Sequence, residues 1–197
     1  MFTGIVQALG KVRDFTSDGT NQTYWIDSPL YSNLSIDQSI AHNGVCLTVE
    51  DLRDGLHRVT AVKETLEKTN LGHWAQGSSV NLERCLTLTG RLDGHFVQGH
   101  IDTVGTCTKI KDLKGSWELS FEFPKKFAFL IIEKGSICIN GVSVTTYKVK
   151  KNSFKVAIIP YTWEHTNFCL LKEGEGVNLE FDMIGKYINR KMSIEAI

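Results

Sequence analysis

The chain has 197 residues, a length that allows one domain or two small ones. Its 22 basic and 22 acidic residues leave no formal net charge, which argues against a protein that binds the nucleic-acid backbone. The hydrophobic share of 42% excludes wholesale disorder, and no apolar run approaches the roughly 20 residues of a membrane span.

Short runs rich in β-branched residues predict β-strands in the first half of the chain. The later runs alternate apolar with polar residues, as half-buried strands do. Between strand-like runs, Asn43-Gly44 and Asn140-Gly141 each predict a tight hairpin turn, because type I′ geometry needs positive φ. The runs span residues 39–41, 46–49, 59–62 and 80–83.

Each half of the chain also predicts two short helices. One begins at Pro29 in the first half and at Pro124 in the second, where Gly135 ends it, because proline is pre-set for the first helical turn. The other is a turn or two at 64–70, ended by Gly72. Many short strands with few helices are typical of small antiparallel barrels.

The last segment, residues 184–197, has no counterpart in the first half of the chain. Ile184, Ile188 and Met192 recur every four residues and form a narrow apolar stripe on a predicted helix. Such a stripe suits contact with another subunit.

The chain contains an internal repeat. A shift of 97 positions aligns SIAHNGVCLT with SICINGVSVT, ETLEKTN with YTWEHTN, and VNLE with VNLE, and a shift of 95 aligns TGIVQALG with QGHIDTVG. Separated blocks in one order indicate two copies of a module of about 90 residues, which suggests a pair of related domains. The first three blocks pair 39–48 with 136–145, 64–70 with 161–167, and 80–83 with 177–180.

The cysteines predict reduced thiols in a cytoplasm. Their count is odd and no CxxC pair occurs, so neither a disulfide framework nor a zinc site is expected. The first residues lack the basic region and cleavage site of a signal peptide. The cysteines are Cys46, Cys85, Cys107, Cys138 and Cys169.

Eight motifs in order resemble the riboflavin synthase family with two lumazine-binding domains. They are MFTGIV, NGVCLTV, KETLEKTNLG, VNLER, GHFVQGHID, KGSICINGVSVT, IIPYT and VNLEFD. The resemblance implies an all-β fold of two tandem Greek-key six-stranded antiparallel β-barrels with short helices, plus a C-terminal helix. The implied units are residues 1–97, 98–183 and 184–197.

The resemblance also implies an activity. Two molecules of 6,7-dimethyl-8-ribityllumazine dismutate to riboflavin and 5-amino-6-ribitylamino-uracil, with no cofactor and no metal. It further implies a homotrimer held by the C-terminal helix, with each active site between the first copy of one subunit and the second copy of its neighbour. Association with the lumazine-producing synthase is left open, as is which copy holds the donor.

A duplicated module suits this reaction, because two identical reactants must play unlike parts. Holding both rings side by side removes part of the entropic barrier. The matched positions that differ in chemistry are therefore the candidates for making the two binding sites unequal. These pairs are Cys46 and Ser143, Cys85 and Asp182, Asp37 and Lys134, and Ile5 and His100.

The resemblance carries two sets of substrate-binding residues onto the matched motifs. A glycine in each set would let a flat ring approach the backbone closely. The first-copy set is Gly4, Ile5, Val6, Ser39, Cys46, Leu47, Thr48, Thr60, Ala61, Val62, Lys63, Glu64 and Thr65. The second-copy set is Gly99, His100, Ile101, Lys134, Ser143, Val144, Thr145, Ala157, Ile158, Ile159, Pro160, Tyr161 and Thr162. Tyr161 is bulkier than the family pattern leads us to expect.

Five residues are candidates for catalysis. His100 can act near neutral pH as the base that takes a proton from the 7-methyl group. Ser143 and Thr145 alternate on one predicted strand and so face the same side. Asp182 is a candidate proton relay, and Cys46 is favoured for polarity over covalent catalysis.

Each candidate has an ordinary alternative. A lone histidine is more often a core or surface residue, a free cysteine is usually inert, and an isolated aspartate at a strand end usually faces solvent. His95 is expected to shape the segment between the two copies. Two other functions stay open: a lumazine or flavin carrier related to the antenna proteins of luminous bacteria, and a barrel scaffold without a ligand.

Overall fold

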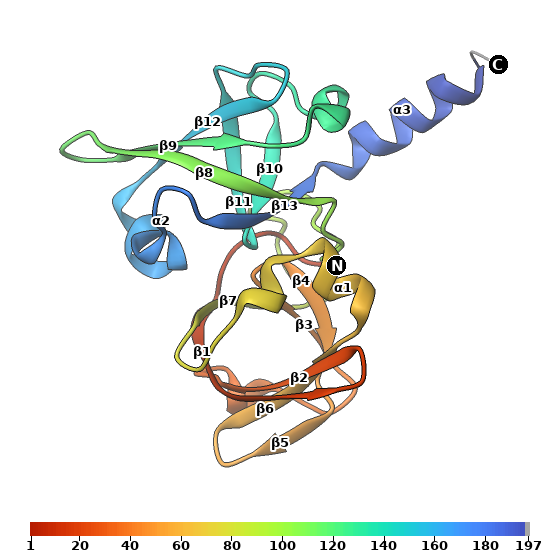
Figure 1. Ribbon diagram of the computed structural model, residues 1–197, viewed down its shortest axis with the longest axis vertical. Helices are drawn as coiled ribbons and strands as arrows, with labels where there is room; N and C mark the ends of the chain where they lie inside the picture. The colour runs from red at the N-terminus through yellow and green to blue at the C-terminus, as the bar shows by residue number, and fades with distance from the viewer. Residues whose placement is uncertain (196–197) are drawn as a thin grey trace.

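Residues 1–195 are described by a computed structural model, in which two β-sheet units lie one above the other (Figure 1). The half-buried alternation predicted for residues 59–62 is present in strand β6 (Leu56–Ala61), where every second side chain is buried, and β12 (Ser153–Ile158) shows the same pattern. The half-buried strand predicted at 80–83 is not found, because Asn81 and Glu83 of β7 (Ser79–Arg84) are buried as well as their apolar neighbours. The apolar side chains on the inner face of each sheet form its core. The predicted all-β fold is therefore confirmed.

The first unit is an antiparallel sheet in the order β4-β3-β7-β1-β2-β6-β5. The sheet curls so that the chain just after β4 reaches β6, where the backbone N–H of Glu50 donates to the carbonyl of Arg58 at 2.9 Å. Strand β5 has no counterpart in the second unit among residues 1–195. The elements are β1 (Ala8–Asp18), β2 (Asn21–Asp27), η1 (Tyr31–Asn33), β3 (Ser39–His42), β4 (Val45–Thr48), β5 (Asp51–Arg53), β6, α1 (Lys63–Lys68), η2 (Asn70–His73) and β7 (Ser79–Arg84).

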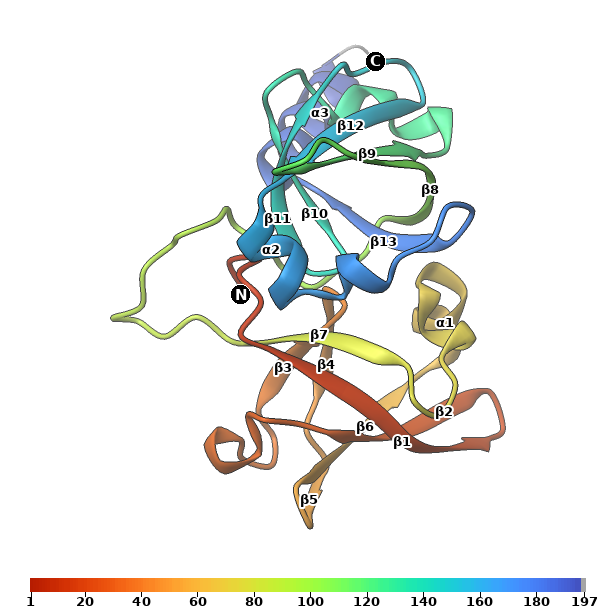
Figure 2. The ribbon, with the colours of Figure 1, turned by 90° about the vertical axis from the view of Figure 1, so that its left-hand side faces the viewer.

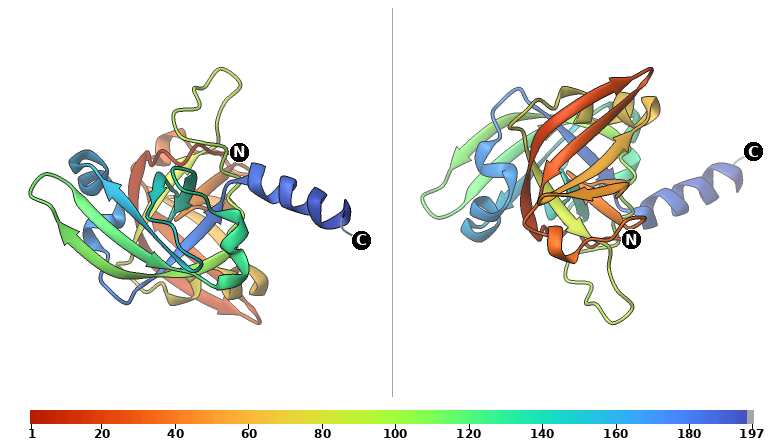
Figure 3. Two further views of the ribbon diagram at one scale, coloured as in Figure 1. Left: turned by 90° about the horizontal axis from the view of Figure 1, so that it is seen from above. Right: turned by 90° about the horizontal axis from the view of Figure 1, so that it is seen from below.

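The second unit is a closed barrel in the order β10-β11-β12-β9-β8-β13, which repeats the order of the first unit without β5. Helix α3 then leaves the body and projects outward (Figure 3). The elements are β8 (Thr103–Asp112), β9 (Trp117–Glu122), η3 (Lys125–Leu130), β10 (Ser136–Ile139), β11 (Val142–Tyr147), β12, α2 (Pro160–His165), η4 (Asn167–Leu170), β13 (Gly176–Phe181) and α3 (Met183–Glu195). The division at 97/98 and 183/184 stays a prediction.

The short helices differ in detail from the prediction. The segments that follow Pro29 and Pro124 are 3-10 turns, and the second ends at Leu130, before Gly135. The helical segment of the first unit runs past Gly72, because the Thr69 side chain accepts a hydrogen bond from the next turn and restarts it. Neither Gly135 nor Gly72 therefore ends its helical segment.

Three asparagines from each unit join the two units, which lie one above the other in Figure 2. The amide of Asn81 donates to the backbone oxygen of Asn140 at 2.8 Å. Its twin, Asn178, donates to the backbone oxygen of Asn43 at 3.0 Å. In the third pair, the backbone N–H groups of Asn70 and Asn167 donate to the side-chain oxygens of Asn178 and Asn81 at 2.7 and 2.8 Å. The bonds come in matched pairs, so the contact has approximate twofold symmetry.

A pair of histidines is buried inside the first unit. The Nε2 atoms of His42 and His57 lie 2.7 Å apart, and Nδ1 of His42 lies 3.1 Å from the carbonyl oxygen of Ile40. If His42 donates through Nδ1, His57 must donate through Nε2, and Nδ1 of His57 then has no partner among the described residues. Burial lowers the pKa of both rings, that of His57 to about 4. The second unit has Ile139 and Phe154 at these positions.

We expect this pair to make the protein sensitive to acid. The unfolded chain takes up protons below about pH 6.5 while the folded histidines stay neutral, so the free energy of unfolding falls as pH drops toward 4. Between pH 6.5 and 5 the loss is about 2 kcal/mol per histidine. Replacing His42→Ile together with His57→Phe should remove this loss in urea unfolding at the two pH values. The exposed His73→Gln is the control, and an unchanged pH dependence in the double variant would refute the assignment.

Candidate active site

Two chain segments, the first at residues 2–6 and the second at residues 97–101, cross between the units and pair with each other. Phe2 pairs with Val97 in an antiparallel bridge, with N···O distances of 2.7 and 3.1 Å. Beyond the bridge, Gly4 lies on strand β11 of the second unit, where its carbonyl accepts from the N–H of Ser143 at 2.8 Å. Gly99 lies on strand β4 of the first unit, where its carbonyl accepts from the N–H of Cys46 at 2.9 Å. Each unit thus contributes a segment to the other.

This exchange corrects the expected grouping of the binding residues. We expected Gly4–Val6 with Cys46 and Gly99–Ile101 with Ser143. Instead, Val6 packs on the second core and Ile101 on the first. The sequence repeat could not reveal the exchange, because the same alignment results whether each segment stays on its own copy or crosses.

The glycines serve the crossing itself. Gly4 and Gly99 have φ angles of +76° and +84°, and a Cβ atom on either would lie 2.6 or 2.5 Å from the Cβ of Ser143 or Cys46. The close approach is therefore between two protein backbones. This differs from the predicted reason, which was the approach of a flat ligand.

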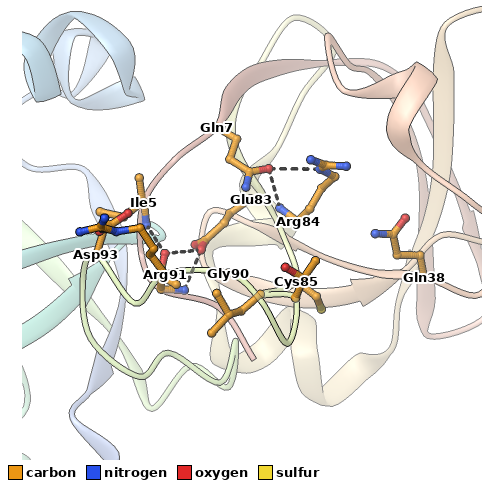
Figure 4. A pocket seen from close by; sticks show the side chains of 12 residues that line it. Ile5, Gln7, Gln38, Glu83, Arg84, Cys85, Gly90, Arg91 and Asp93 are labelled. Carbon is orange, nitrogen blue, oxygen red and sulfur yellow. Dashed lines mark hydrogen bonds and ion pairs between the residues drawn. The ribbon is translucent and has the colours of Figure 1, made fainter.

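A buried glutamate holds each crossing segment. Glu180 accepts from the N–H groups of Gln98, Gly99 and His100 at 2.7–3.1 Å. Its counterpart Glu83 accepts from the first crossing segment in the same way (Figure 4). Burial raises the pKa of both carboxyls, and the hydrogen bonds oppose the rise. The prediction missed both residues, although the identical VNLE blocks contained the signal.

The first half-site consists of Cys46 and Thr65 with the crossing residues Gly99, His100 and Ile101. These line a cavity of about 240 Å³ at the mouth of the first unit. Burial raises the pKa of the Cys46 thiol, so the sulfur stays protonated near neutral pH. The predicted candidates Cys46 and His100 are thus brought together in one cavity.

The second half-site contains Ser143 with the crossing residues Gly4, Ile5 and Val6. The shift of 97 matches Thr162 of α2 to Thr65 of the first half-site. The second half-site gains a group that the first half-site lacks, because Nδ1 of the buried His95 lies 2.7 Å from Oγ of Ser143. Burial lowers the pKa of His95, and the carboxylate of Asp182 partly opposes this. Sequence reasoning gave His95 only a shaping role, since its spacing in GHFVQGHID does not reveal its contact with Ser143.

Several predicted binding residues cannot offer their side chains to a ligand at the surface. The side chains of Leu47, Ala61 and Ile158 are buried in the cores, so only their backbone groups remain available. The hydroxyl of Thr60 donates to Glu50 at 2.9 Å. Exposed side chains on or beside the two short helices include Val62, Lys63, Glu64, Ile159, Pro160 and Tyr161.

Lys134 and Thr145 lie toward the other end of strand β11 from Ser143. The Lys134 ammonium is 5.7 Å from the ring centre of Tyr147, the last residue of that strand. Thr145 is exposed and pairs with Ser136 on the neighbouring strand. The backbone carbonyl of Ser39 accepts a hydrogen bond from the Cys85 thiol at 3.4 Å, near the first half-site. Lys134 and Thr145 are therefore exposed on the second unit, whereas Ser39 is half-buried near the first half-site.

A second cavity, of about 280 Å³, lies between the first crossing segment and the loop that follows β7 (Figure 4). Ile5 and Asp93 line it, so it adjoins the second half-site. Within residues 1–195 we find no cluster of three or more metal-binding side chains. The same residues include no helix with the length and apolar character to cross a membrane.

Comparisons with known proteins agree with this duplicated architecture. A family model described as "Lumazine binding domain" matches residues 3–85 and again 98–182. Riboflavin synthase of Mycobacterium bovis is 40% identical over 200 residues, covering 98% of each chain. Riboflavin synthase of Actinobacillus pleuropneumoniae is 39% identical over 191 residues, covering 96% of this chain and 89% of that one. A solved structure of LumP complexed with riboflavin shares the fold, with a TM-score of 0.86 and 24% identity over 92% of this chain and 99% of that one.

Proposed function

Because the chain belongs to the riboflavin synthase family and is a transferase, we propose that it dismutates two molecules of 6,7-dimethyl-8-ribityllumazine. One molecule gives a four-carbon unit to the other, which yields riboflavin and 5-amino-6-ribitylamino-uracil. The observation that carries the proposal is the pair of half-sites, alike in backbone and unlike in chemistry. Cys46 and His100 mark the first, whereas Ser143 and His95 mark the second.

Binding is assigned to matched features of the half-sites. Each offers backbone groups of a crossing segment and threonine hydroxyls, which suit the uracil-like edge of a lumazine and its ribityl chain. We retain the predicted contact residues on this basis, with the side chains of Leu47, Ala61 and Ile158 excluded by their burial. Fixing two rings in one centre turns their encounter into an intramolecular step.

Proton transfers are assigned to the two histidines. We propose His100 as the base that takes a proton from the 7-methyl group at the first half-site. At the second, burial keeps the His95 imidazole neutral, so it can accept the proton of Ser143 while that hydroxyl orients a water or binds developing charge. Asp182 would stabilise the imidazolium that forms.

We further propose a homotrimer in which a first half-site faces the second half-site of a neighbouring subunit. Its support is the exposed apolar stripe of α3, where Ile184, Ile188 and Met192 are 56–64% exposed. The stripe borders an apolar groove of about 590 Å³ that also includes Phe129 and Ile132. A salt bridge of 2.7 Å from Lys186 to Asp102 holds the start of the helix.

The cytoplasm is proposed as the compartment, supported by five free cysteines, all within the described residues. The carrier function remains the second candidate, because the fold is shared with LumP. A carrier needs no neutral histidine beside a serine, so the contact between His95 and Ser143 favours the enzyme.

Incubation of the protein with the lumazine, without added cofactor, tests the proposal. We expect the absorption spectrum of riboflavin to appear, with one riboflavin and one diaminouracil product formed for every two lumazines consumed. Tight binding with an unchanged spectrum over hours would indicate the carrier. Absence of both binding and turnover would refute both functions.

A further inference from the structure

Helices α1 and α2 are equivalent in the repeat but carry different chemistry. Glu64 and Lys68 of α1 line the first half-site cavity together with Cys46. The shift of 97 places Tyr161 and His165 at the equivalent positions of α2. A pair of opposite charges at one half-site thus corresponds to a pair of aromatic rings at the other.

The two rings of α2 form one flat surface. Tyr161 and His165 are four residues apart on the helix, and their rings stack with centroids 4.1 Å apart and planes inclined by 16°. Nδ1 of His165 lies 2.8 Å from the carbonyl oxygen of Tyr161, which fixes the histidine ring. Tyr161 is 69% exposed, so most of its side chain is available to a ligand.

A second stack holds this helix on its barrel. Trp163 of α2 lies against Trp117 of β9, with centroids 4.5 Å apart and planes inclined by 3°. The first unit has Leu66 in place of Trp163 and therefore lacks this stack. The aromatic surface of α2 is consequently attached to a rigid strand, which lowers the entropic cost of binding against it.

We propose that Tyr161, stacked on His165, determines the specificity of the second half-site by placing an aromatic face against the conjugated ring of the ligand. Glu64 and Lys68 give the first half-site a charged wall instead, which suits hydroxyl groups. Tyr161 thereby makes the two half-sites unequal in affinity for the same molecule. The inference rests on the proposed function, since it takes the ligand to be a lumazine or flavin.

Riboflavin titration of the full chain, followed by calorimetry, tests this role. The wild-type protein should show two affinities per chain. Tyr161→Glu and Tyr161→Leu should each weaken one of them about 3- to 10-fold, the size of one aromatic contact, and leave the other unchanged. Tyr161→Phe keeps the ring face and should bind as the wild type does. The reciprocal variant Glu64→Tyr should change the affinity of the first half-site instead.

The outcomes separate this inference from the proposed function. Unchanged affinities in Tyr161→Glu and Tyr161→Leu, in a protein that binds riboflavin, would overturn the role of Tyr161 alone. Equal losses in Tyr161→Phe and Tyr161→Leu would also overturn it, because the hydroxyl rather than the ring face would then matter. A wild-type chain that neither binds riboflavin nor converts lumazine would refute the proposed function first. Near-ultraviolet circular dichroism of the stacked Trp117 and Trp163 checks that α2 keeps its place in each variant.

Discussion

Replacing Ser143→Ala should lower kcat about 100-fold or more while leaving the affinity of the first half-site for lumazine unchanged. The hydroxyl of Ser143 has a neutral imidazole 2.7 Å away, and losing a positioned proton-transfer or charge-stabilising group has this size of effect. Steady-state assays with the lumazine measure the rate, and equilibrium titration measures the binding. Ser153→Ala, which alters a half-buried serine of the same barrel, is the matched control.

The partner of Ser143 can be tested in the same assays. His95→Gln should cost a similar factor, and the double variant should be little worse than either single one, because the two groups act as a unit. Since burial lowers the pKa of His95, the part of the acid loss of rate that disappears in His95→Gln should lie below the usual range of histidine. Full activity in Ser143→Ala, or additive losses in the double variant, would exclude this pair from the reaction.

Replacing Gly141→Ala should give a large loss of stability, because Gly141 lies against the backbone of the other unit. Gly141 has a φ of +81°, and a Cβ atom there would lie 2.8 Å from the backbone nitrogen of Gly44 in the other unit. Positive φ costs about 1 kcal/mol for alanine, and the clash adds about 1–3 kcal/mol, since backbone on both sides must shift. Urea unfolding measures the difference from the wild-type protein.

A glycine of the same barrel provides the control for this substitution. Gly174 has a φ of +92° and open space where a Cβ atom would stand, so Gly174→Ala isolates the conformational cost. We expect it to lose about 1 kcal/mol. Equal losses in the two variants would show that the contact between Gly44 and Gly141 contributes nothing to docking.

The repeated blocks predicted the fold because they contain its turns and strands. Asn43 and Gly44 both have positive φ, as do Asn140 and Gly141, so the predicted hairpin turns are confirmed. The prediction did not identify the contact between the units, which uses asparagines that are identical in the two copies. The asparagines of NGV, KTN or HTN, and VNLE lie between the units, where they make the paired hydrogen bonds.

The site was harder to predict than the fold, for a physical reason. Alternation and turn chemistry are local, whereas the contacts of Gly4 with Ser143 and of Gly99 with Cys46 join residues far apart in the chain. A repeat shows which residues match but not which copy a crossing segment lies on. The same holds for His95, whose position beside Ser143 depends on the path of the loop between the units.

The central claim is that one reaction centre combines a first half-site and a second half-site of neighbouring chains, and subunit mixing tests it most directly. His100→Ala leaves the second half-site intact, and Ser143→Ala leaves the first intact. After the two variants are unfolded and refolded together, random assembly should restore roughly a quarter of the wild-type rate, because half of each kind of half-site is intact. Activity that stays at the average of the two separate variants would contradict the account.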